Sequence, residues 1–297
     1  MQSETAFDID QFDLSFYALK RASAQFSDNV NVPYGNKIYT DMFRINGATK
    51  GENKVLTLLG PTLSVSEGEQ LTAGKVTAFA EHEFTTVKGY GITGISVAAT
   101  AFEKAMQSAS ANDDKAILEK IFAGKDTISL SNSADVMRSY GGADVLKGNG
   151  GNDLLVAGGG ADNVFGGSGK DRIYGGSGED IIVGGTGKDW VKGGSGSDKY
   201  IYNSKTEAGD TISDFSRTDF IAVKGSKFGG LPKGQLDPDY FAFGSGTGSL
   251  DKNTRFIFNV DDDKLWYDSN GTGKSGLTLI ADLNIDFLLA WTDIFVI

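Results

Sequence analysis

Residues 139–201 read SYGGADVLK, GNGGNDLLV, AGGGADNVF, GGSGKDRIY, GGSGEDIIV, GGTGKDWVK and GGSGSDKYI, which are consecutive segments of nine residues each. The sixth residue of every segment is an aspartate: Asp144, Asp153, Asp162, Asp171, Asp180, Asp189 and Asp198. Glycines precede each aspartate, and an apolar or aromatic residue follows it two positions later, from Leu146 in the first segment to Tyr200 in the last. A fixed period of this kind indicates a repeat architecture.

Each nonapeptide predicts a glycine-rich turn followed by a short strand. Glycine reaches positive φ without a Cβ clash, and the middle one of the three residues after the aspartate points its apolar side chain to one face. Two such units close one flattened coil, and stacked coils place their strands about 4.8 Å apart in two parallel sheets. We therefore predict an all-β-dominated fold built on a parallel β-roll with a thin apolar core.

The aspartates of such a roll would form two files, one along each edge. One file is Asp144, Asp162, Asp180 and Asp198, and the other is Asp153, Asp171 and Asp189. Carboxylates one coil apart repel each other, so the coils need a cation between them. Carboxylate and carbonyl oxygens are the ligands that Ca²⁺ prefers. The alternative, a flexible glycine-rich linker, gives no reason for aspartate and an aliphatic residue to keep a strict register.

GGSGKDRIY (residues 166–174) and its neighbours resemble GGxGxDxUx, the calcium-binding nonapeptide of the RTX (hemolysin-type) repeat family. The resemblance implies a calcium-stacked β-roll in which each ion lies between turns one coil apart, bound by two aspartates and by turn carbonyls. The implied pairs are Asp144/Asp162, Asp153/Asp171, Asp162/Asp180, Asp171/Asp189 and Asp180/Asp198, and the implied carbonyls include those of Gly166, Ser168, Gly184 and Gly185. With further turns at both ends we expect about five to eight ions.

The repeat divides the chain into three predicted domains. Residues 1–120 alternate polar and apolar residues in short runs, which predicts a small β domain. Two helices, over residues 98–109 and 112–123, are expected to end this domain, and the second is expected to cap the roll. The roll itself is predicted over residues 121–201, with degenerate first turns at Asp126 and Asp135, and Asp135 is a candidate ligand. Residues 202–297 are predicted to form a C-terminal β cap.

The cap region carries three further resemblances to the family. GDTISDFSRTDFIAV (residues 209–223) is similar to the element that closes the roll, which implies that Asp210 and Asp214 add ligands. RFIFNVDDDKLWYDSNGTGKSGLTLIADL alternates on both sides of SNGTG and predicts a β-hairpin. The segment AWTDIFVI resembles the uncleaved signal read by type I secretion machinery, and the alternative is an ordinary strand.

Composition and motifs exclude several classes of function. The formal net charge is −11, and no basic stripe is present, which argues against nucleic acid as a partner. No apolar run is long enough for a transmembrane segment, cysteines are absent, and MQSETAFDID lacks the pattern of a secretory signal peptide. His82 is the single histidine, so the histidine motif of a zinc protease cannot be built, and no GxSxG or P-loop motif is present.

The sequence therefore predicts a calcium-binding, secreted, extracellular protein, free or associated with the cell surface. It would fold on extracellular calcium and act by binding or adhesion to polysaccharide or a cell surface, without enzymatic activity. The alternative is a calcium-dependent polysaccharide-active enzyme or its accessory module. Its candidate carboxylates would be Glu81, Glu83, Asp237, Asp239 and Asp261 to Asp263. A pore-forming toxin is disfavoured because long apolar segments are missing.

Overall fold

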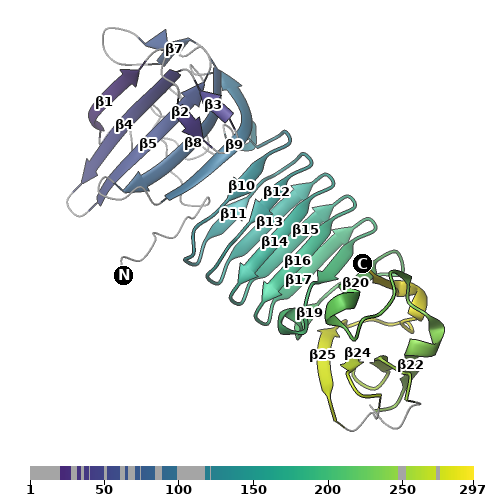
Figure 1. Cartoon of the computed structure of the whole chain (residues 1–297). Helices are drawn as coiled ribbons and strands as arrows, with labels where there is room; N and C mark the ends of the chain where they lie inside the picture. The colour runs from purple at the N-terminus through teal and green to yellow at the C-terminus, as the bar shows by residue number, and fades with distance from the viewer. Residues whose placement is uncertain are drawn as a thin grey trace. The chain divides into compact units, whose positions relative to one another are not determined.

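The computed structural model describes residues 118–120, 122–246, 252–271 and 275–297 in full, and the backbone of nine strands between Arg21 and Ala98. The chain forms two compact units, Met1–Val145 and Leu146–Ile297. Figure 1 shows the strands of both units. Within the described residues, no helix is long and apolar enough to cross a membrane.

The first unit contains an antiparallel sheet. Its strands follow the order β1 (Arg21–Ser27), β4 (Asp41–Thr49), β5 (Glu52–Gly60), β8 (Lys75–Glu83), β9 (Gly89–Ala98) and β10 (Thr127–Ser129), each antiparallel to the next. Two small ladders join β2 (Val32–Tyr34) to β3 (Lys37–Tyr39) and β6 (Ser64–Val65) to β7 (Leu71–Ala73). β11 (Val136–Arg138) completes this unit, and β12 (Val145–Lys147) begins at its end. The structure describes five residues of the predicted helices: residues 118–120 are helical, whereas residues 122 and 123 lie in a turn and a bend, so the second helix does not reach residue 123. The other residues of the predicted helices lie outside the described residues.

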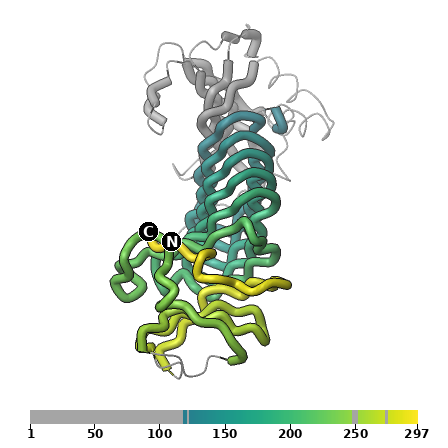
Figure 2. Tube along the Cα trace, turned by 90° about the vertical axis from the view of Figure 1, so that its right-hand side faces the viewer, coloured from purple at the N-terminus to yellow at the C-terminus, as the bar shows by residue number. Residues whose placement is uncertain are grey.

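The second unit begins with the predicted parallel β-roll. One sheet contains β13 (Leu154–Gly159), β15 (Arg172–Ser177), β17 (Trp190–Ser195) and β19 (Asp210–Ile212). The other contains β14 (Asn163–Ser168), β16 (Ile181–Thr186), β18 (Lys199–Tyr202) and β20 (Phe220–Val223). Leu154 pairs with Arg172 and Asn163 with Ile181, so that one coil is 18 residues, as predicted. Figure 2 shows these coils stacked on one another.

The core between the two sheets consists of the residue two positions after each aspartate. Leu155, Val164, Ile173, Ile182 and Val191 are all buried. Their neighbours on each strand point the other way, as strand geometry requires. One aliphatic side chain for every nine residues makes this a thin core, and it confirms the predicted inward-facing position.

The last coil of the roll is three residues longer than the others. Val191 pairs with Ile212 and Tyr200 with Ile221, a step of 21 residues in each case. The extra length holds the short 3₁₀ helix η2 (Lys205–Glu207). The period therefore changes here while the strand pairing continues.

The cap extends both sheets of the roll. β25 (Leu277–Asp282) pairs parallel with β19, and β24 (Lys264–Asp268), β23 (Phe256–Asn259) and β22 (Phe241–Gly244) follow it in order. On the other sheet, β26 (Ile294–Val296) pairs parallel with β20, and β21 (Gly234–Gln235) pairs antiparallel with β26. The 3₁₀ helices η3 (Gly225–Lys227), η4 (Pro238–Tyr240) and η5 (Trp291–Asp293) connect these strands.

The segment AWTDIFVI contains an internal strand of the sheet. Ile294 and Val296 of β26 are buried. The Gln235 side-chain amide donates to the carbonyls of Trp291 (2.9 Å) and Ile294 (2.8 Å), which fixes the strand in place. This segment therefore adopts an ordinary strand. Its recognition by type I secretion machinery stays a prediction.

Candidate calcium sites

The aspartates of successive coils are joined by hydrogen bonds. The backbone N–H of Asp153 donates to Oδ1 of Asp171 (2.9 Å), and that of Asp171 donates to Oδ1 of Asp189 (2.8 Å). The same bond links Asp162 to Asp180 (2.9 Å) and Asp180 to Asp198 (3.0 Å) on the other edge. The fold therefore brings together four of the five predicted pairs, and the Asp144/Asp162 pair stays a prediction. In the first unit, the N–H of Asp126 donates to Oδ1 of Asp144 (2.8 Å).

These hydrogen bonds leave the second carboxylate oxygen of four of the aspartates without a donor. The Oδ2 atoms of Asp171, Asp180, Asp189 and Asp198 are buried and accept no hydrogen bond. A buried carboxylate oxygen without a donor is costly, so such groups are normally paired or coordinate a metal. A bound cation would compensate these Oδ2 atoms, which recur at the same position in each repeat.

The turn glycines show what faces these Oδ2 atoms. A Cβ added at Gly166 would collide with Asp171 Oδ2 and with the carbonyl oxygen of Gly184. A Cβ at Gly148 would likewise collide with Asp153 Oδ2 and the Gly166 carbonyl. Each of these spaces therefore presents a carboxylate oxygen to a carbonyl oxygen. Two acceptors cannot satisfy each other, whereas a calcium ion binds both kinds of oxygen.

The same burial disturbs the ionisation of the aspartates. Loss of water on burial raises the pKa of Asp171 to about 6, with a smaller contribution from the charge of Asp189. Burial also raises the pKa of Asp180 to about 7, and the charges of Asp162 and Asp198 add to the effect. The pKa of Asp189 is raised by burial as well. The aspartate file is thus poorly solvated, and a bound cation would stabilise its charged form.

The remaining predicted ligands lie in different settings. Ser168 is in β14, and its carbonyl accepts from the N–H of Gly151 (2.9 Å). Gly185 has φ 101° and packs against the Gly167 carbonyl. Asp135 Oδ2 accepts from the N–H (2.9 Å) and the hydroxyl (2.8 Å) of Ser131. Calcium ligation by these three residues stays a prediction.

The closing element continues the aspartate files. Asp210 Oδ1 accepts from the N–H of Asp189 (2.9 Å), so Asp210 takes the next position after Asp189. Asp214 instead accepts from the N–H groups of Gly193 and Gly194 (3.0 Å each), which places it across the turn and outside the file. The residue in line after Asp198 is Asp219, whose Oδ1 accepts from the Asp198 N–H (2.9 Å).

Sequence reasoning took Asp210 and Asp214 from the closing element and left Asp219 out of the candidate ligands. A signal was available in the step of 21 residues, which separates Asp189 from Asp210 and also Asp198 from Asp219. Two equal longer steps indicate that one complete coil has been lengthened and that both files continue.

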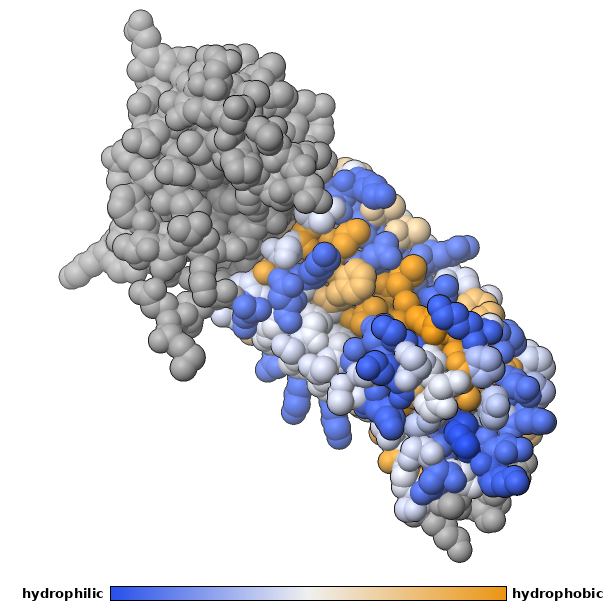
Figure 3. All heavy atoms as spheres, viewed as in Figure 1, coloured by the Kyte–Doolittle hydropathy of each residue, from blue (hydrophilic) through white to orange (hydrophobic). Residues whose placement is uncertain are grey.

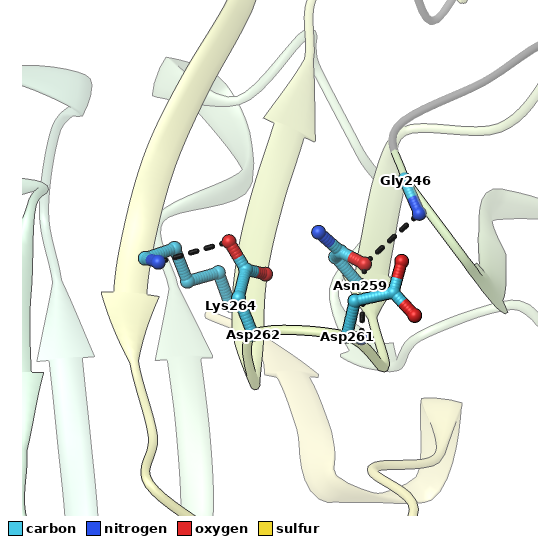
Figure 4. Close-up of polar contacts among 5 residues, drawn as sticks. All are labelled: Gly246, Asn259, Asp261, Asp262 and Lys264. Atoms are coloured by element: carbon cyan, nitrogen blue, oxygen red, sulfur yellow. Dashed lines mark hydrogen bonds and ion pairs between the residues drawn. The ribbon is translucent and has the colours of Figure 1, made fainter.

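Among the carboxylates of the enzymatic alternative, those of Asp237 and Asp262 make local contacts. Asp237 accepts from the N–H of Asp239 (3.0 Å) at the start of η4. Figure 4 shows the turn between β23 and β24, where Asp262 forms an ion pair with Lys264 (2.9 Å) and Asn259 accepts from the N–H of Asp261 (3.1 Å). The side chains of Glu81, His82 and Glu83 lie outside the described residues.

A calcium site here would combine few carboxylates with several carbonyls. Within the part of the chain that the structure describes, no three His, Cys, Asp or Glu side chains are grouped to hold a metal. The residues that fit calcium are Asp171 with the Gly184 carbonyl, and Asp153 with the Gly166 carbonyl. A bound ion would supply positive charge between coils, while the chain orients the oxygens through the aspartate hydrogen bonds.

Comparison with protein families agrees with this geometry for the roll. The model of the RTX calcium-binding nonapeptide repeat (four copies) matches residues 123–146, 139–173, 147–182 and 174–203. A search of the curated proteins gives no match. Among solved structures, the chain is similar to the solution structure of the AlgE6R3 subunit from the Azotobacter vinelandii mannuronan C5-epimerase. The identity is 23%, and the match covers 58% of this chain and 77% of that one. The TM-score is 0.24, which is too low to show a shared overall fold. Residues 123–203 of this chain therefore belong to the RTX calcium-binding nonapeptide repeat family.

Proposed function

We propose that this chain is an extracellular protein whose roll folds when it meets calcium, and whose folded roll acts as a binding module for polysaccharide or a cell surface. The observation that carries the calcium step is the row of buried Oδ2 atoms without donors, opposite turn carbonyls. Free calcium in the cytosol is too low to fill sites of the millimolar kind expected for extracellular modules. The roll would then stay unfolded inside the cell, which suits export by type I secretion machinery, and would fold outside.

The outer face of β15 and β17 supports the binding role. Arg172 and Trp190 are register neighbours on this face, and the guanidinium carbon lies 5.2 Å from the Trp190 ring centroid. The Tyr174 ring lies 5.1 Å from that of Trp190. Aromatic and arginine side chains of this kind are enriched in binding surfaces.

A hollow of about 520 Å³ lies beside the Tyr174 ring. It is lined by Tyr174, Lys192, Ser195 and Asp214, together with two turn glycines. A hydroxyl, an ammonium group and a carboxylate beside an aromatic ring suit a hydroxyl-rich ligand such as a saccharide. Figure 3 shows hydrophobic residues lying among hydrophilic ones on the face of the roll that it presents.

The test is retention of the purified chain on immobilised polysaccharides and on cells, in millimolar calcium and in EDTA. We expect retention in calcium, release in EDTA, and weaker retention of Trp190→Ala. Phe243→Ala is the matched control, because Phe243 is an exposed aromatic residue of the cap. Retention that is equal for wild type and Trp190→Ala would contradict the assigned face. Loss of polysaccharide during incubation would instead favour the enzymatic alternative.

A further inference from the structure

The residue five positions before each aspartate borders the space in front of that aspartate's Oδ2. Glycines occupy this position before Asp153, Asp171, Asp180 and Asp189, as Gly148, Gly166, Gly175 and Gly184. A Cβ at any of the four would collide with the Oδ2 of its aspartate. Only glycine therefore leaves the two facing oxygens open to an ion.

Asp162 breaks this rule, because the residue five positions before it is Ala157. Ala157 lies on β13 in register with Gly175 on β15, since the flanking pairs are Val156 with Tyr174 and Gly158 with Gly176. A Cβ at Gly175 would collide with Asp180 Oδ2 and the Gly193 carbonyl. By this register, the methyl group of Ala157, which is fully buried, takes the equivalent position before Asp162.

Asp198 also has a glycine five positions before it, Gly193, but a different group lies opposite its Oδ2. A Cβ at Gly193 would collide with Asp198 Oδ2 and with the hydroxyl of Tyr200, whereas a carbonyl oxygen faces Oδ2 at Gly148, Gly166 and Gly175. Tyr200 holds the core position that Val191 or Ile182 holds in other repeats, and its longer side chain reaches the turn. Both the hydroxyl and Asp198 Oδ2 are buried without a hydrogen-bond partner. A phenol can donate, so a small rotation gives a charge-assisted bond to the carboxylate.

The geometry points to unequal edges of the roll: the edge of Asp153, Asp171 and Asp189 is open to calcium throughout, whereas the opposite edge is open at Asp180 and closed by protein groups at Asp162 and Asp198. The Ala157 methyl and the Tyr200 hydroxyl take the place of the ion at the two closed positions. Asp144 of the same file also has a protein group beside it, because the side chain of Ser139, five positions earlier, hydrogen-bonds to Asp144. The inference rests on the proposed calcium function and reduces the expected number of ions to about four.

The test is the number of calcium ions bound by the full chain, measured by equilibrium dialysis at millimolar calcium. Ala157→Gly is expected to bind one ion more than wild type, and Gly175→Ala, at the paired position, one ion fewer. Tyr200→Phe removes the donor and is expected to gain one ion at Asp198. Gly244→Ala is the control, because a Cβ there meets nothing within 4 Å and its φ is ordinary.

The outcomes separate this inference from the proposed function. Wild-type protein that binds no calcium would refute the function itself. If the wild type binds calcium but Ala157→Gly and Tyr200→Phe both keep the wild-type number, the unequal edges are refuted while the calcium function stands. Because both are gain-of-site variants, failure of Gly175→Ala to fold does not affect this decision, and far-UV circular dichroism confirms that each variant is folded.

Discussion

The roll and the cap of the second unit reach order by different physical means. Each nonapeptide of the roll buries one or two apolar side chains and one carboxylate, such as Ile173 and Asp171. The cap buries an aromatic cluster in which Phe228 and Tyr267 meet edge to face, with centroids 5.1 Å apart, and Phe256 packs against both. Apolar burial stabilises the cap directly, whereas burial of carboxylates opposes folding of the roll until a cation is bound. The difference predicts that calcium controls one region and not the other.

The two regions are nevertheless joined through their strands. The cap strands β25 and β26 pair with β19 and β20 of the last coil. A folded cap would therefore present an ordered edge on which the last coil can form. The difference between roll and cap can be tested by removing calcium, the strand β26, single aspartate ligands and finally the charge of the carboxylates.

Removal of calcium should have the largest effect. In EDTA we expect the roll to lose its β structure, because its thin core cannot offset the ordering entropy and the carboxylates repel. The near-UV signal of the cap, with its packed Phe228, Phe256 and Tyr267, should persist in part. Far- and near-UV circular dichroism during titration with EDTA and then calcium measures both regions. An unchanged far-UV spectrum would refute the calcium requirement, and simultaneous loss of both signals would show that the regions fold as one.

Deletion of Asp293–Ile297 should have the next largest effect. The deletion removes β26 with its two buried residues, Ile294 and Val296, and exposes the edge of β20. Each lost side chain is worth about 1.5–3 kcal/mol. We therefore expect a clearly lower thermal midpoint for the calcium-loaded protein, with Leu288→Ala, at an exposed position, as the control. An unchanged midpoint would mean that these residues serve only as a signal for export.

Asp171→Asn should weaken calcium binding more than Asp198→Asn. Sequence alone suggests this order because Asp198 has a full-motif partner on one side only. In the structure the N–H of Asp198 bonds to Asp219 in the next coil, so Asp198 also has an aspartate neighbour on its other side. The structure supplies another reason: Asp171 faces a carbonyl and Asp198 faces the Tyr200 hydroxyl. We expect the calcium midpoint to rise about tenfold for Asp171→Asn, or about 1.4 kcal/mol. Calorimetric titration of both variants measures this, and equal midpoints would contradict the assignment.

The smallest effect should be that of pH on the calcium-free protein. Burial raises the pKa of Asp171 to about 6, of Asp180 to about 7 and of Asp210 to about 8, above the ordinary value of an aspartate. At pH values between the ordinary pKa of the unfolded chain and these raised pKa values, the folded chain binds more protons than the unfolded chain. The stability of the calcium-free fold therefore falls as pH rises through this range. We expect more β structure in EDTA at about pH 5.5 than at about pH 8. A calcium-free fold that gains order with rising pH would contradict this sign, and saturating calcium should reduce the difference.

The sequence by itself determined the roll, because each element of the motif has a local physical reason. The coil length, the inward position of Ile173 and the two files of aspartates follow from glycine turns and strand alternation, and the structure confirms them. These features depend on residues within one or two coils, so a period visible in the sequence is sufficient to predict them.

Only the tertiary structure decided which oxygens face each other. The Tyr200 hydroxyl beside Asp198, and the Ala157 methyl in register with Gly175, depend on where side chains of neighbouring coils meet. The continuation of the files to Asp219 and the pairing of β26 with β20 likewise depend on a lengthened coil and a returning chain. Contacts between residues far apart in the chain depend on register and side-chain length together, and neither is set by the local nine-residue pattern.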